Sequence, residues 1–582
     1  MDKLLDFLKH YFKKMEYGDN NSETSRSASF TSVRHQTTLS PIRSKVVLGL
    51  VFFAFCCLLL RALWLQGLST DFLQKQGESR YARTLVMPAI RGRILDRNGH
   101  VLASSMEVKA IWAIPEDVAA APKDKLNELA TLLDLPMETL TQKLSSDKSF
   151  VYLKHQVDVE VADKIMALNI PGIQTKKEYK RYYPEGEVMS HIVGFTNAED
   201  KGQEGVERAY QEELSGENGS RRVIKDRLGR IVEDLQDTKE PVDGKDLMLS
   251  IDSKLQYIAF KCLQDAIAEH HAKAGSVVVL DSRTGEVLAM VNMPSYNPND
   301  RSNLSVEKLR NRAMTDAFEP GSIMKPFAVS LGLDRGKVTP NSMIDTNGGK
   351  MKIGTAVIGD SHPNGTLSVS QVIEKSSNIG TAKIALMFSP EEMWNMFSSV
   401  GFGQKPDFGF PGATPGLLRP YKAWVPVDQA TMSYGHGIAV SLFQIARAYT
   451  IFGRNGDIIS LTFLKRDDIP DGEQVISPNT ANQMRHMLEL VVGPGGTAKQ
   501  AHVAGYRVGG KTGTAYKLEH GQYVKKYIGS FVGLAPISNP RVVIAVMIDE
   551  PTAGHFGGTV AAPVFATLAA EIMRAMNIPP DA

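Results

Sequence analysis

The longest hydrophobic run of the chain covers residues 46–65, where Val, Leu, Phe and Ala dominate. A helix of about 20 apolar residues is long enough to cross the hydrocarbon core of a bilayer. Arg61 and Trp64 stand near one end of the run, where such side chains reach the membrane interface. Residues 1–45 are mostly polar and no small-residue cleavage pattern follows the run, so it predicts an uncleaved anchor rather than a signal peptide.

Two shorter segments precede the anchor. Residues 1–15 place Leu4, Leu8 and Phe12 on one side of a predicted amphipathic helix, which could lie on the inner membrane surface, dock a partner or have no function. Residues 22–38 are rich in Ser and Thr, lack an apolar period and predict a disordered linker. Basic residues flank the anchor almost evenly, so charge alone does not decide its orientation.

Residues 66–239 mix short strand-like runs with charged helices, which are expected at 126–133 and 161–168 among others. No set of catalytic side chains gathers in this stretch. A glycan-polymerising domain would need more room and acidic residues of its own. We therefore expect no separate chemistry here.

Residues 240–582 predict an α/β domain. The apolar runs SVVVLD and EVLAMV indicate a hairpin around a turn at 282–285. Three further strands are expected in VGGKTGTAYKL, YIGSFVGLA and RVVIAVMID, the first two joined by a turn at His520 and Gly521. Helices that carry Ser322 and Ser376 are expected between the two groups of strands, and a small-residue helix at 560–576 can pack flat on a sheet. Five strands divided by a helical insertion predict an α/β sandwich.

Composition adds three limits. The chain has 582 residues, which is enough for more than one domain and a large core. Its 66 basic and 64 acidic residues nearly balance, so charge gives no sign of nucleic-acid binding. Cys56 and Cys57 are adjacent inside the anchor and only Cys262 remains, which does not suit a disulfide framework.

The motif FEPGSIMKP supplies a candidate nucleophile. Pro320 and Gly321 predict a turn that starts a helix, and Ser322 in its first turn would lie near unpaired backbone N–H groups. Lys325 falls three residues later on the same face, close enough to take the hydroxyl proton. Its pKa of about 10.4 would have to fall to roughly 7 or 8, through burial or through a second cation such as Lys511.

The motif KTGT predicts a strand that could hold a peptide. Alternation places Lys511 and Gly513 on one face and Thr512 and Thr514 on the other. The small Gly513 lets a second backbone approach closely. An extended peptide could add to this strand, with its terminal carboxylate near the lysine and the threonine hydroxyls. The expected substrate is therefore peptide-like and anionic.

Only the combination of motifs is specific. Ser-x-x-Lys recurs at Ser145 and Ser305, and the Ser-x-Asn pattern of Ser376 to Asn378 recurs at Ser295 and Ser477, whereas Lys-Thr-Gly occurs once. Taken singly, such residues are more often helix caps, solvated charges or polar loop clusters. Together and in this order, they indicate acyl transfer through a serine ester.

At this point the chain resembles the penicillin-binding transpeptidases, whose three motifs follow the same order. Longer strings resemble the class B, monofunctional members: RGRILDRNGHVLA (91–103), GQEGVERAYQEELSG (202–216), AGSVVVLDSRTGEVLAMVNMPSYNPN (274–299), YGHG (434–437) and YIGSFVGLAP (527–536). SHIVGFTN at 190–197 is more similar to the cell-division, FtsI type than to the elongation type. The resemblance runs from about residue 45 to the end.

The resemblance implies a D,D-transpeptidase that cross-links peptidoglycan stem peptides during septum formation. Ser322 would be the acylated nucleophile and Lys325 its base. Ser376 would relay a proton to the leaving amine, and Lys511 would complete the catalytic group. β-Lactams would acylate the same serine and remain attached.

The same resemblance implies a substrate-binding set. Asn378 would hold the substrate amide, and the hydroxyls of Thr512 and Thr514 would bind the terminal D-Ala carboxylate beside Gly513. The backbone N–H groups of Thr514 and of the nucleophile would form the oxyanion hole, an element worth roughly 3 to 4 kcal/mol in other acyl transferases. No metal or cofactor is implied.

The implied fold is an α/β penicillin-binding transpeptidase fold, a five-stranded antiparallel sheet with helices on both faces and a helical subdomain. The implied domains are a cytoplasmic tail (1–45), a transmembrane anchor (46–65), an elongated α+β pedestal of the dimerisation type (66–239) and a transpeptidase domain (240–582). The catalytic domain would face the periplasm from the inner membrane. Implied partners are stem peptides, lipid-linked precursor, other division proteins and a SEDS-type, FtsW-like glycan polymerase.

Several alternatives stay open. The motifs do not separate a transpeptidase from a D,D-carboxypeptidase or endopeptidase, in which water replaces the acceptor amine. An elongation-type enzyme or a non-catalytic division scaffold also fits, whereas a pure β-lactam sensor would lack the pedestal. His436 in YGHG could line the cleft or could be a structural turn residue. His270 and His271 are expected at a solvated helix end rather than in a metal site.

Overall fold

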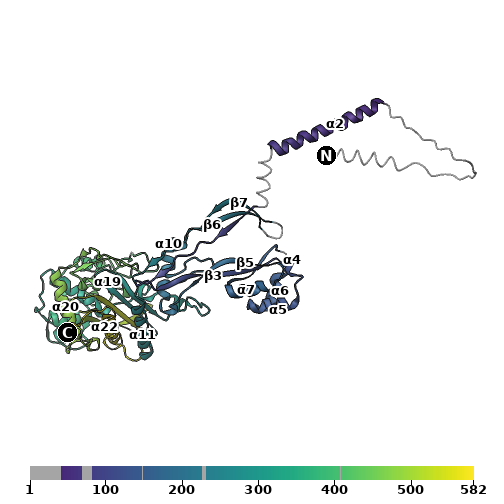
Figure 1. Cartoon of the computed structure of the whole chain (residues 1–582). Helices are drawn as coiled ribbons and strands as arrows, with labels where there is room; N and C mark the ends of the chain where they lie inside the picture. Colours follow the sequence, from purple (N-terminus) through teal and green to yellow (C-terminus); the bar gives the residue numbers. More distant parts are fainter. Residues whose placement is uncertain (1–40, 69–81, 147, 226–230, 407) are drawn as a thin grey trace, which may run out of the picture. The chain divides into compact units, whose positions relative to one another are not determined.

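The computed structural model describes residues 41–68, 82–146, 148–225, 231–406 and 408–582 (Figure 1). The predicted amphipathic helix at 1–15 and linker at 22–38 lie outside the described residues. The chain divides into two compact units, Met1–Ala82 and Arg83–Ala582, which are taken one at a time.

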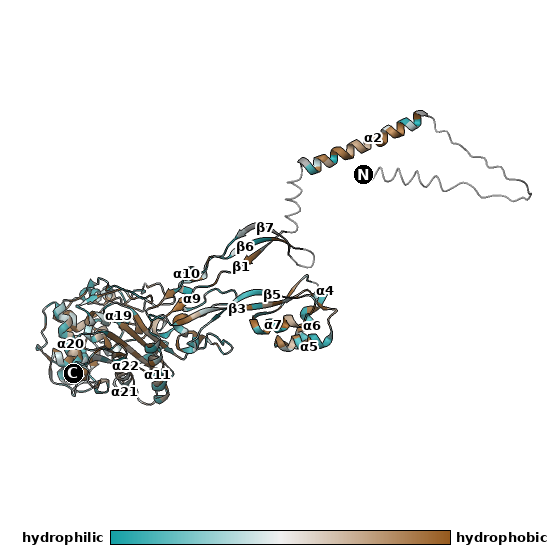
Figure 2. Ribbon diagram, viewed as in Figure 1, coloured by the Kyte–Doolittle hydropathy of each residue, from teal (hydrophilic) through white to brown (hydrophobic). Residues whose placement is uncertain are grey.

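The first unit contains the anchor as helix α2 (Pro41–Leu63), which continues into a π-helical turn at Trp64–Leu68. It is the one helix among the described residues that is long and apolar enough to cross a membrane, over Ile42–Gln66. Its large apolar side chains are exposed. Much of the α2 ribbon is brown, the colour of hydrophobic residues, in Figure 2. The predicted anchor is therefore helical and begins slightly earlier than the hydrophobic run suggested.

The second unit is built around a five-stranded antiparallel sheet. In spatial order its strands are β10 (Val287–Met293), β9 (Ala274–Asp281), β19 (Val542–Asp549), β18 (Gln522–Ala535) and β17 (Gly509–Glu519). Strands β9, β10 and β19 are buried along their whole length, which explains their continuous apolar sequences. The turn of the β17–β18 hairpin uses His520 and Gly521 at positive φ, as predicted. All five predicted strands are present, and β17 lies at one edge.

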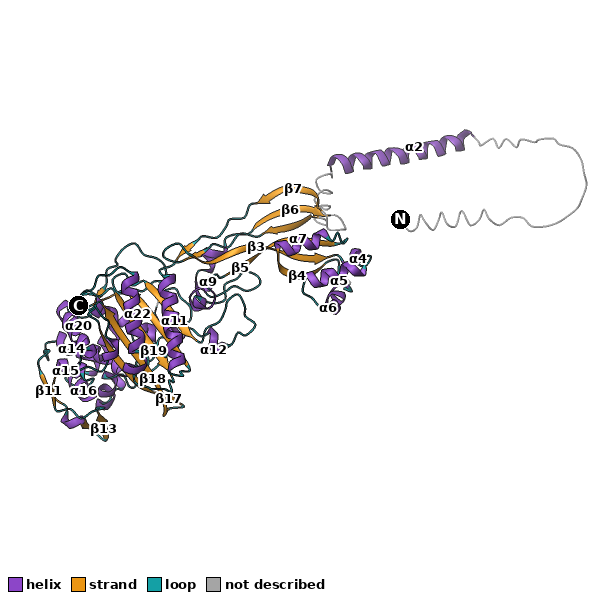
Figure 3. Ribbon diagram, turned by 60° about the horizontal axis from the view of Figure 1, so that its bottom comes forward, coloured by secondary structure: helices purple, strands orange, loops and turns teal. Residues whose placement is uncertain are grey.

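Helices cover both faces of this sheet (Figure 3). Helix α11 (Ser253–Glu269) packs with α22 (Ala562–Ala575) on one face, and α19 (Leu442–Gly453) packs against β9 and β19 on the other. The carboxylate of Asp252 caps α11 by accepting from Lys254 N and Leu255 N. At the other end of α11, His271 is exposed as predicted, whereas His270 is buried with its Nδ1 2.9 Å from Ala553 O, so the prediction of a solvated helix end is wrong for His270.

The helical insertion lies between β10 and β17. Its main helices are α14 (Lys325–Asp334), α15 (Val369–Glu374), α16 (Asn378–Ala385), α17 (Pro390–Ser399), α18 (Pro426–Ser433) and α20 (Pro478–Val492). Phe327 on α14 contacts the rings of Phe402, Tyr449 and Phe452 at 5.3 to 5.5 Å between centroids. This aromatic core fixes α14, and with it the segment that carries Ser322.

Smaller elements connect these helices and strands. They are α12 (Val306–Leu309), α13 (Arg312–Thr315), β11 (Met343–Asp345), β12 (Lys350–Ile353), β13 (Ala356–Gly359), β14 (Thr366–Ser368), β15 (Asp457–Ile458), β16 (Glu473–Gln474) and α21 (Gly557–Val560). Strands β12 and β13 pair only with each other among the described residues, as a short hairpin beside the insertion.

The N-terminal part of the unit contains two more sheets. In one, the long strand β3 (Val101–Ala113) pairs with β4 (Val151–Asp158) and β5 (Ile173–Tyr182), and β2 (Ile94–Leu95) links it to β8 (Leu247–Met248). The other has the order β1 (Ala82–Met87), β6 (Gly219–Lys225), β7 (Ile231–Lys239). A small lobe with its own apolar cluster is formed by α4 (Pro115–Val118), α5 (Lys123–Leu132), α6 (Met137–Leu144) and α7 (Val159–Ala167). Helices α5 and α7 confirm the two expected from the sequence.

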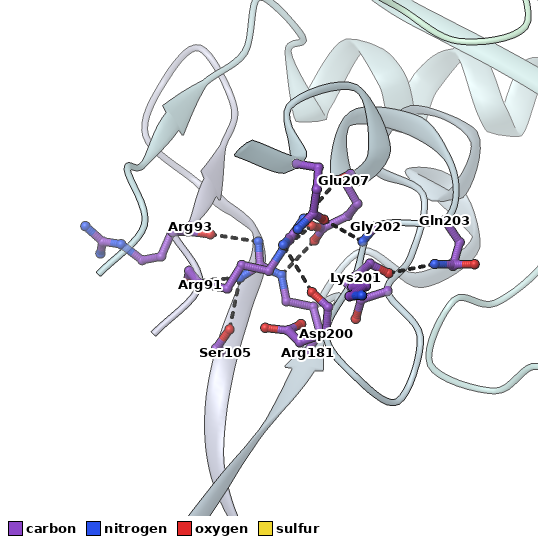
Figure 4. A network of polar contacts seen from close by, with 12 residues as sticks. Arg91, Arg93, Ser105, Arg181, Asp200, Lys201, Gly202, Gln203 and Glu207 are labelled. Atoms are coloured by element: carbon purple, nitrogen blue, oxygen red, sulfur yellow. Dashed lines mark hydrogen bonds and ion pairs between the residues drawn. The ribbon is translucent and has the colours of Figure 1, made fainter. Parts of the chain in front are cut away.

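A buried network of ion pairs lies between the loop after β1, strands β3 and β5, and helix α9 (Figure 4). Glu207 on α9 (Gly205–Ala209) accepts from Arg91 Nε at 2.6 Å and from Arg181 Nε at 2.7 Å. All three side chains are almost completely buried. Arg181 also donates to the backbone oxygens of Arg91 and Gly92 and to Ser105 Oγ. The network ties the loop after β1 to β3, β5 and α9, and it gives a structural role to the first two of the long resembling strings.

Next to α9 stand α8 (Ser190–Val193) and α10 (Gln211–Ser215). Ser190 Oγ lies 2.9 Å from Ser295 Oγ, and Tyr296 Oη donates to Ser190 O at 3.0 Å. The main apolar core runs continuously from this region into the five-stranded sheet. Because one core spans both sides of residue 240, the domain boundary between residues 239 and 240 stays a prediction.

Candidate active site

Ser322 lies in a 3-10 turn, Gly321–Met324, that leads directly into α14 at Lys325. Residues three apart are nearly eclipsed in a 3-10 helix, so Ser322 and Lys325 share one side of this segment. The sequence predicted the helix start but not the tighter geometry of its first turn. Ser322 is partly exposed, whereas Lys325 is completely buried.

Two glycines, Gly435 and Gly513, allow the Ser322 turn to pack closely against the loop at 434–437 and against β17. Gly321 N donates to Gly435 O at 3.1 Å, and a Cβ on Gly435 would overlap the Gly321 carbonyl. On the other side, a Cβ on Gly513 of β17 would overlap the Ser530 hydroxyl and come within 2.9 Å of Pro320 O. The close approach predicted for Gly513 is therefore present, and it is the Ser322 turn that uses it.

Ser376 lies between two buried amines. Its Oγ is 3.1 Å from Lys325 Nζ and 2.9 Å from Lys511 Nζ, and its carbonyl also accepts from Lys325. The sequence placed Ser376 on a helix, and this was wrong. It occupies the turn between α15 and α16 with φ +60°, a conformation that points its hydroxyl out of both helices toward the lysines.

The two lysines are strongly perturbed. Burial lowers the pKa of Lys325 well below its ordinary value, the charge of Lys511 lowers it further, and Asp360 opposes both. Burial lowers the pKa of Lys511 to about 7. Two buried amines with lowered pKa values, with one hydroxyl between them, are suited to proton transfer near neutral pH.

The start of α16 holds Asn378. Its Nδ2 donates to Gly359 O at 2.8 Å. The Ser377 hydroxyl accepts from Gly380 N as a helix cap and donates to Asp360 Oδ2 at 2.7 Å. Asp360 Oδ1 accepts from the N–H of Ile379. Asp360 was missed by the sequence analysis because it stands in a loop without a motif, and only the fold brings it to this helix end.

Thr512 and Thr514 both contact segments that the sequence did not link to them. Thr512 Oγ1 lies 2.9 Å from Thr497 Oγ1, and Gly557 N donates to Thr514 Oγ1 at 3.0 Å. Thr497 follows α20 and Gly557 starts α21, so both come from loops that border β17. The hydroxyls of Thr512 and Thr514 are thus held by neighbours, whereas Lys511 points to Ser376.

A further group of polar contacts surrounds Glu319, three residues before Ser322. Glu319 accepts from Gly437 N at 2.8 Å and from Tyr523 Oη at 3.0 Å, and one of its oxygens lies 3.3 Å from His436 Nδ1. Burial raises the pKa of Glu319, but hydrogen bonds from these three groups and the charge of His436 outweigh it and lower the pKa. His436 is therefore paired with a carboxylate that lies three residues before Ser322. Glu319 and Tyr523 were not predicted.

The site as a whole combines a partly exposed serine, two buried amines that share one hydroxyl, and the edge strand β17, whose outer side pairs with no other strand in the described part of the chain. Such an arrangement can acylate a hydroxyl and can bind an extended chain alongside β17. Hydrogen bonds join Lys325, Ser376 and Lys511 directly, and Gly513 lies against the turn that carries Ser322. Asn378 follows closely after Ser376 and contacts Gly359, whereas Thr512 and Thr514 lie beside Gly513 on β17 and contact Thr497 and Gly557.

Two family models match this chain. The penicillin binding protein transpeptidase domain matches residues 275–570, and the penicillin-binding protein dimerisation domain matches residues 86–249. The first range contains the whole candidate site. The second contains the buried ion network and the small helical lobe.

Similar proteins agree with these matches. The chain is 42% identical over 544 residues to a probable peptidoglycan D,D-transpeptidase PenA of Neisseria gonorrhoeae, an alignment that covers 92% of this chain and 93% of that one. It is 40% identical over 548 residues to the peptidoglycan D,D-transpeptidase FtsI of Escherichia coli, with 93% of each chain covered. The transpeptidase domain of Burkholderia pseudomallei penicillin-binding protein 3 superposes with a TM-score of 0.54 at 53% identity, over 57% of this chain and 98% of that one. The chain therefore belongs to the penicillin-binding protein transpeptidase family, and its two matched domains make it a class B member.

Proposed function

We propose that this chain is a serine-type D,D-transpeptidase that cross-links the stem peptides of peptidoglycan and is acylated by β-lactams. One observation carries the proposal: the Ser376 hydroxyl lies between the buried amines of Lys325 and Lys511, next to the Ser322 turn and the edge strand β17. The names of the two relatives support the same activity.

In the first step, Ser322 Oγ attacks the carbonyl carbon of the penultimate D-Ala, and its proton passes to the neutral amine of Lys325. The C–N bond to the terminal D-Ala then breaks. The leaving nitrogen receives a proton through the Ser376 hydroxyl, which is replenished from the lysine pair. The products are an ester on Ser322 and free D-Ala.

Binding of the donor peptide uses β17. The terminal carboxylate lies near Lys511 and the hydroxyls of Thr512 and Thr514, while Asn378 holds the amide of the peptide. The small Gly513 keeps the strand close to the Ser322 turn. The N–H groups of Ser322 and Thr514 receive the oxyanion, a contribution of about 3 kcal/mol in comparable sites.

In the second step, an amine of another stem peptide attacks the Ser322 ester. Its proton returns through the lysine pair to Ser322 Oγ, and a new peptide bond joins the two stems. Water attacking in place of the amine would give a carboxypeptidase, so the acceptor decides the reaction class.

The location follows from the anchor and the substrate. We propose that α2 is a single membrane span, that residues 1–45 are cytoplasmic, and that residues 66–239 and 240–582 are periplasmic pedestal and catalytic domains. The name FtsI of one relative supports action at the division septum. We also propose an FtsW-like glycan polymerase as a partner. A fluorescent fusion in live cells tests this, since a lateral pattern without a septal band would favour the elongation role.

The activity is tested with purified chain, a synthetic pentapeptide ending in D-Ala-D-Ala and an added amine acceptor. The expected product is the donor joined to the acceptor, with release of one D-Ala, and Ser322→Ala should form none. Hydrolysed tetrapeptide as the only product at every acceptor concentration would instead assign the chain as a carboxypeptidase.

A further inference from the structure

A cavity of about 270 Å³ lies on the same face of the sheet as the Ser322 turn. Ile528 of β18 lines the cavity and stands opposite Ala515 of β17 in the ladder. Directly opposed residues share one face of a sheet, and a Cβ on Gly321 would lie 3.7 Å from the Ala515 Cβ. The cavity is therefore close to the catalytic turn, although none of the motif residues is among the described residues that line it.

One wall of the cavity is the segment 316–318, which leads from α13 to the Ser322 turn. Buried Phe318 supplies an apolar surface there, and Ile528 and Met547 continue this surface on the sheet. The cavity volume lies just below the roughly 300–1,000 Å³ of typical small-molecule sites. A ligand that fits is therefore small and has a compact apolar group.

An arginine in the lining has a hydrogen-bond donor without an acceptor. The side chain of Arg312 is only 7% exposed, and its Nε donates to no group in the described part of the chain. Its Nη1 lies 3.2 Å from one oxygen of Asp316, and Arg310 Nε lies 2.5 Å from the other. A buried donor without an acceptor is costly, and an acceptor atom inside the cavity would remove that cost.

The acidic groups around the cavity are engaged by other cations. Asp549 accepts from Lys517 at 2.8 Å, and Asp316 serves both arginines. Glu550 stands just outside the lining, 2.8 Å from Lys517 Nζ and 3.6 Å from Lys273 Nζ. The donor that lacks a partner thus belongs to an arginine, and a guanidinium group binds an oxyanion better than a neutral acceptor.

We propose that this cavity is a second ligand site, which binds a small organic anion: a carboxylate or a phosphate ester with a compact apolar body. The oxyanion accepts from Arg312 Nε, and the apolar body packs on Phe318, Ile528 and Met547. The ligand lies against the segment 316–318 without entering the catalytic group. This inference goes beyond the transpeptidase function and does not depend on it.

Three probes with the same aromatic body test this proposal: para-fluorobenzoate, para-fluorophenyl phosphate and the uncharged para-fluorobenzyl alcohol. Fluorine NMR of each probe with the full chain in detergent gives its Kd, with detergent alone as the blank. At least one anion is expected to bind about tenfold more tightly than the alcohol, as for a charge-assisted hydrogen bond. The tighter anion distinguishes a carboxylate ligand from a phosphate ester, and high salt should weaken its binding.

Substituted chains then locate the binding. Arg312→Gln removes the charged donor and is expected to weaken binding of the tighter anion about tenfold or more. Asp316→Asn releases both arginines from their shared carboxylate, so it should tighten binding about threefold or more. Arg574→Gln breaks an exposed arginine–glutamate pair on α22 and is the matched control, with an unchanged Kd. Thermal unfolding shows whether each variant is folded.

The proposal is overturned if neither anion binds more tightly than the alcohol, or if Arg312→Gln binds the anion as tightly as the wild-type chain. Should Arg312→Gln fail to fold, Asp316→Asn decides, and unchanged or weaker binding overturns the proposal. A chain that binds the anions as expected but forms no ester on Ser322 would contradict the proposed function alone, so the two failures are distinguishable.

Discussion

Lys511 donates a 2.9 Å hydrogen bond to the hydroxyl of Ser376, although the two residues are 135 positions apart in the chain. Lys511 comes from the edge strand of the sheet and Ser376 from a turn in the helical insertion. With Lys325 on the other side of the same hydroxyl, this contact joins the three motifs into one site. Because burial disfavours the charge on both amines, the site is poised to move protons.

The rate of acylation by a fluorescent penicillin is expected to fall as the pH is lowered from about 9 to about 5. The base must be neutral to accept a proton. The pKa of Lys325 is far below its ordinary value and that of Lys511 is about 7, so the neutral amine exists near neutral pH and is lost as the pH falls through the lowered pKa. Stopped-flow fluorescence measures the rate. A constant rate over this range would contradict a lysine base.

Two neighbouring serines are expected to respond differently to replacement by alanine. Ser376→Ala removes the hydroxyl between the lysines and should slow acylation about 10²- to 10⁴-fold with little effect on thermal stability. Ser377→Ala removes a helix cap and the bond to Asp360, and should destabilise the fold by about 1 kcal/mol. Stopped-flow rates and thermal unfolding together separate the two effects. Equal rates for the two variants would refute the role of Ser376.

Gly513→Ala should disrupt the contact between β17 and the Ser322 turn. The added methyl would overlap the Ser530 hydroxyl and crowd Pro320 O, so the turn must move away from the strand. We expect a loss of about 1–3 kcal/mol of stability and strongly reduced labelling by penicillin. Gly365→Ala is the control, because a Cβ there meets nothing within 4 Å. If Gly513→Ala labels at the wild-type rate, the close approach is not needed for activity.

Glu207→Gln tests the buried network of Figure 4. The substitution removes the carboxylate that pairs with both buried arginines, Arg91 and Arg181, and breaking such a buried ion pair costs about 3–5 kcal/mol. The control is Glu217→Gln, which removes the exposed partner of Lys239 and should change stability by less than about 0.5 kcal/mol. Thermal or urea unfolding gives both values. If both variants lose less than about 0.5 kcal/mol of stability, the buried network does not stabilise this part of the fold.

Most of the fold could be predicted because its pattern is local. Strands β9, β10 and β19 are continuous apolar runs, and the hairpin turn at His520 and Gly521 needs residues that accept positive φ. The anchor is equally clear from length and composition. The 3-10 turn at Ser322 and the non-helical position of Ser376 were missed, because both depend on packing against distant segments rather than on local propensity.

The motif residues of the site could be predicted from their order in the chain. The residues that hydrogen-bond to them or to their neighbours could not. Asp360, Thr497 and Glu319 stand in loops, and each acquires its role only where the fold places it against a motif residue. Single carboxylates and hydroxyls in loops are too common to indicate such contacts. The ion network likewise joins residues more than a hundred positions apart, from Arg91 to Glu207.

The central claim is that Ser322 forms an acyl-enzyme with the help of the lysine pair. Mass analysis of peptides from the penicillin-treated chain tests it most directly. The account predicts a single adduct of the mass of the opened β-lactam on the peptide that contains Ser322, and none in the Ser322→Ala chain. An adduct on another residue, or an unchanged adduct in Ser322→Ala, would contradict it.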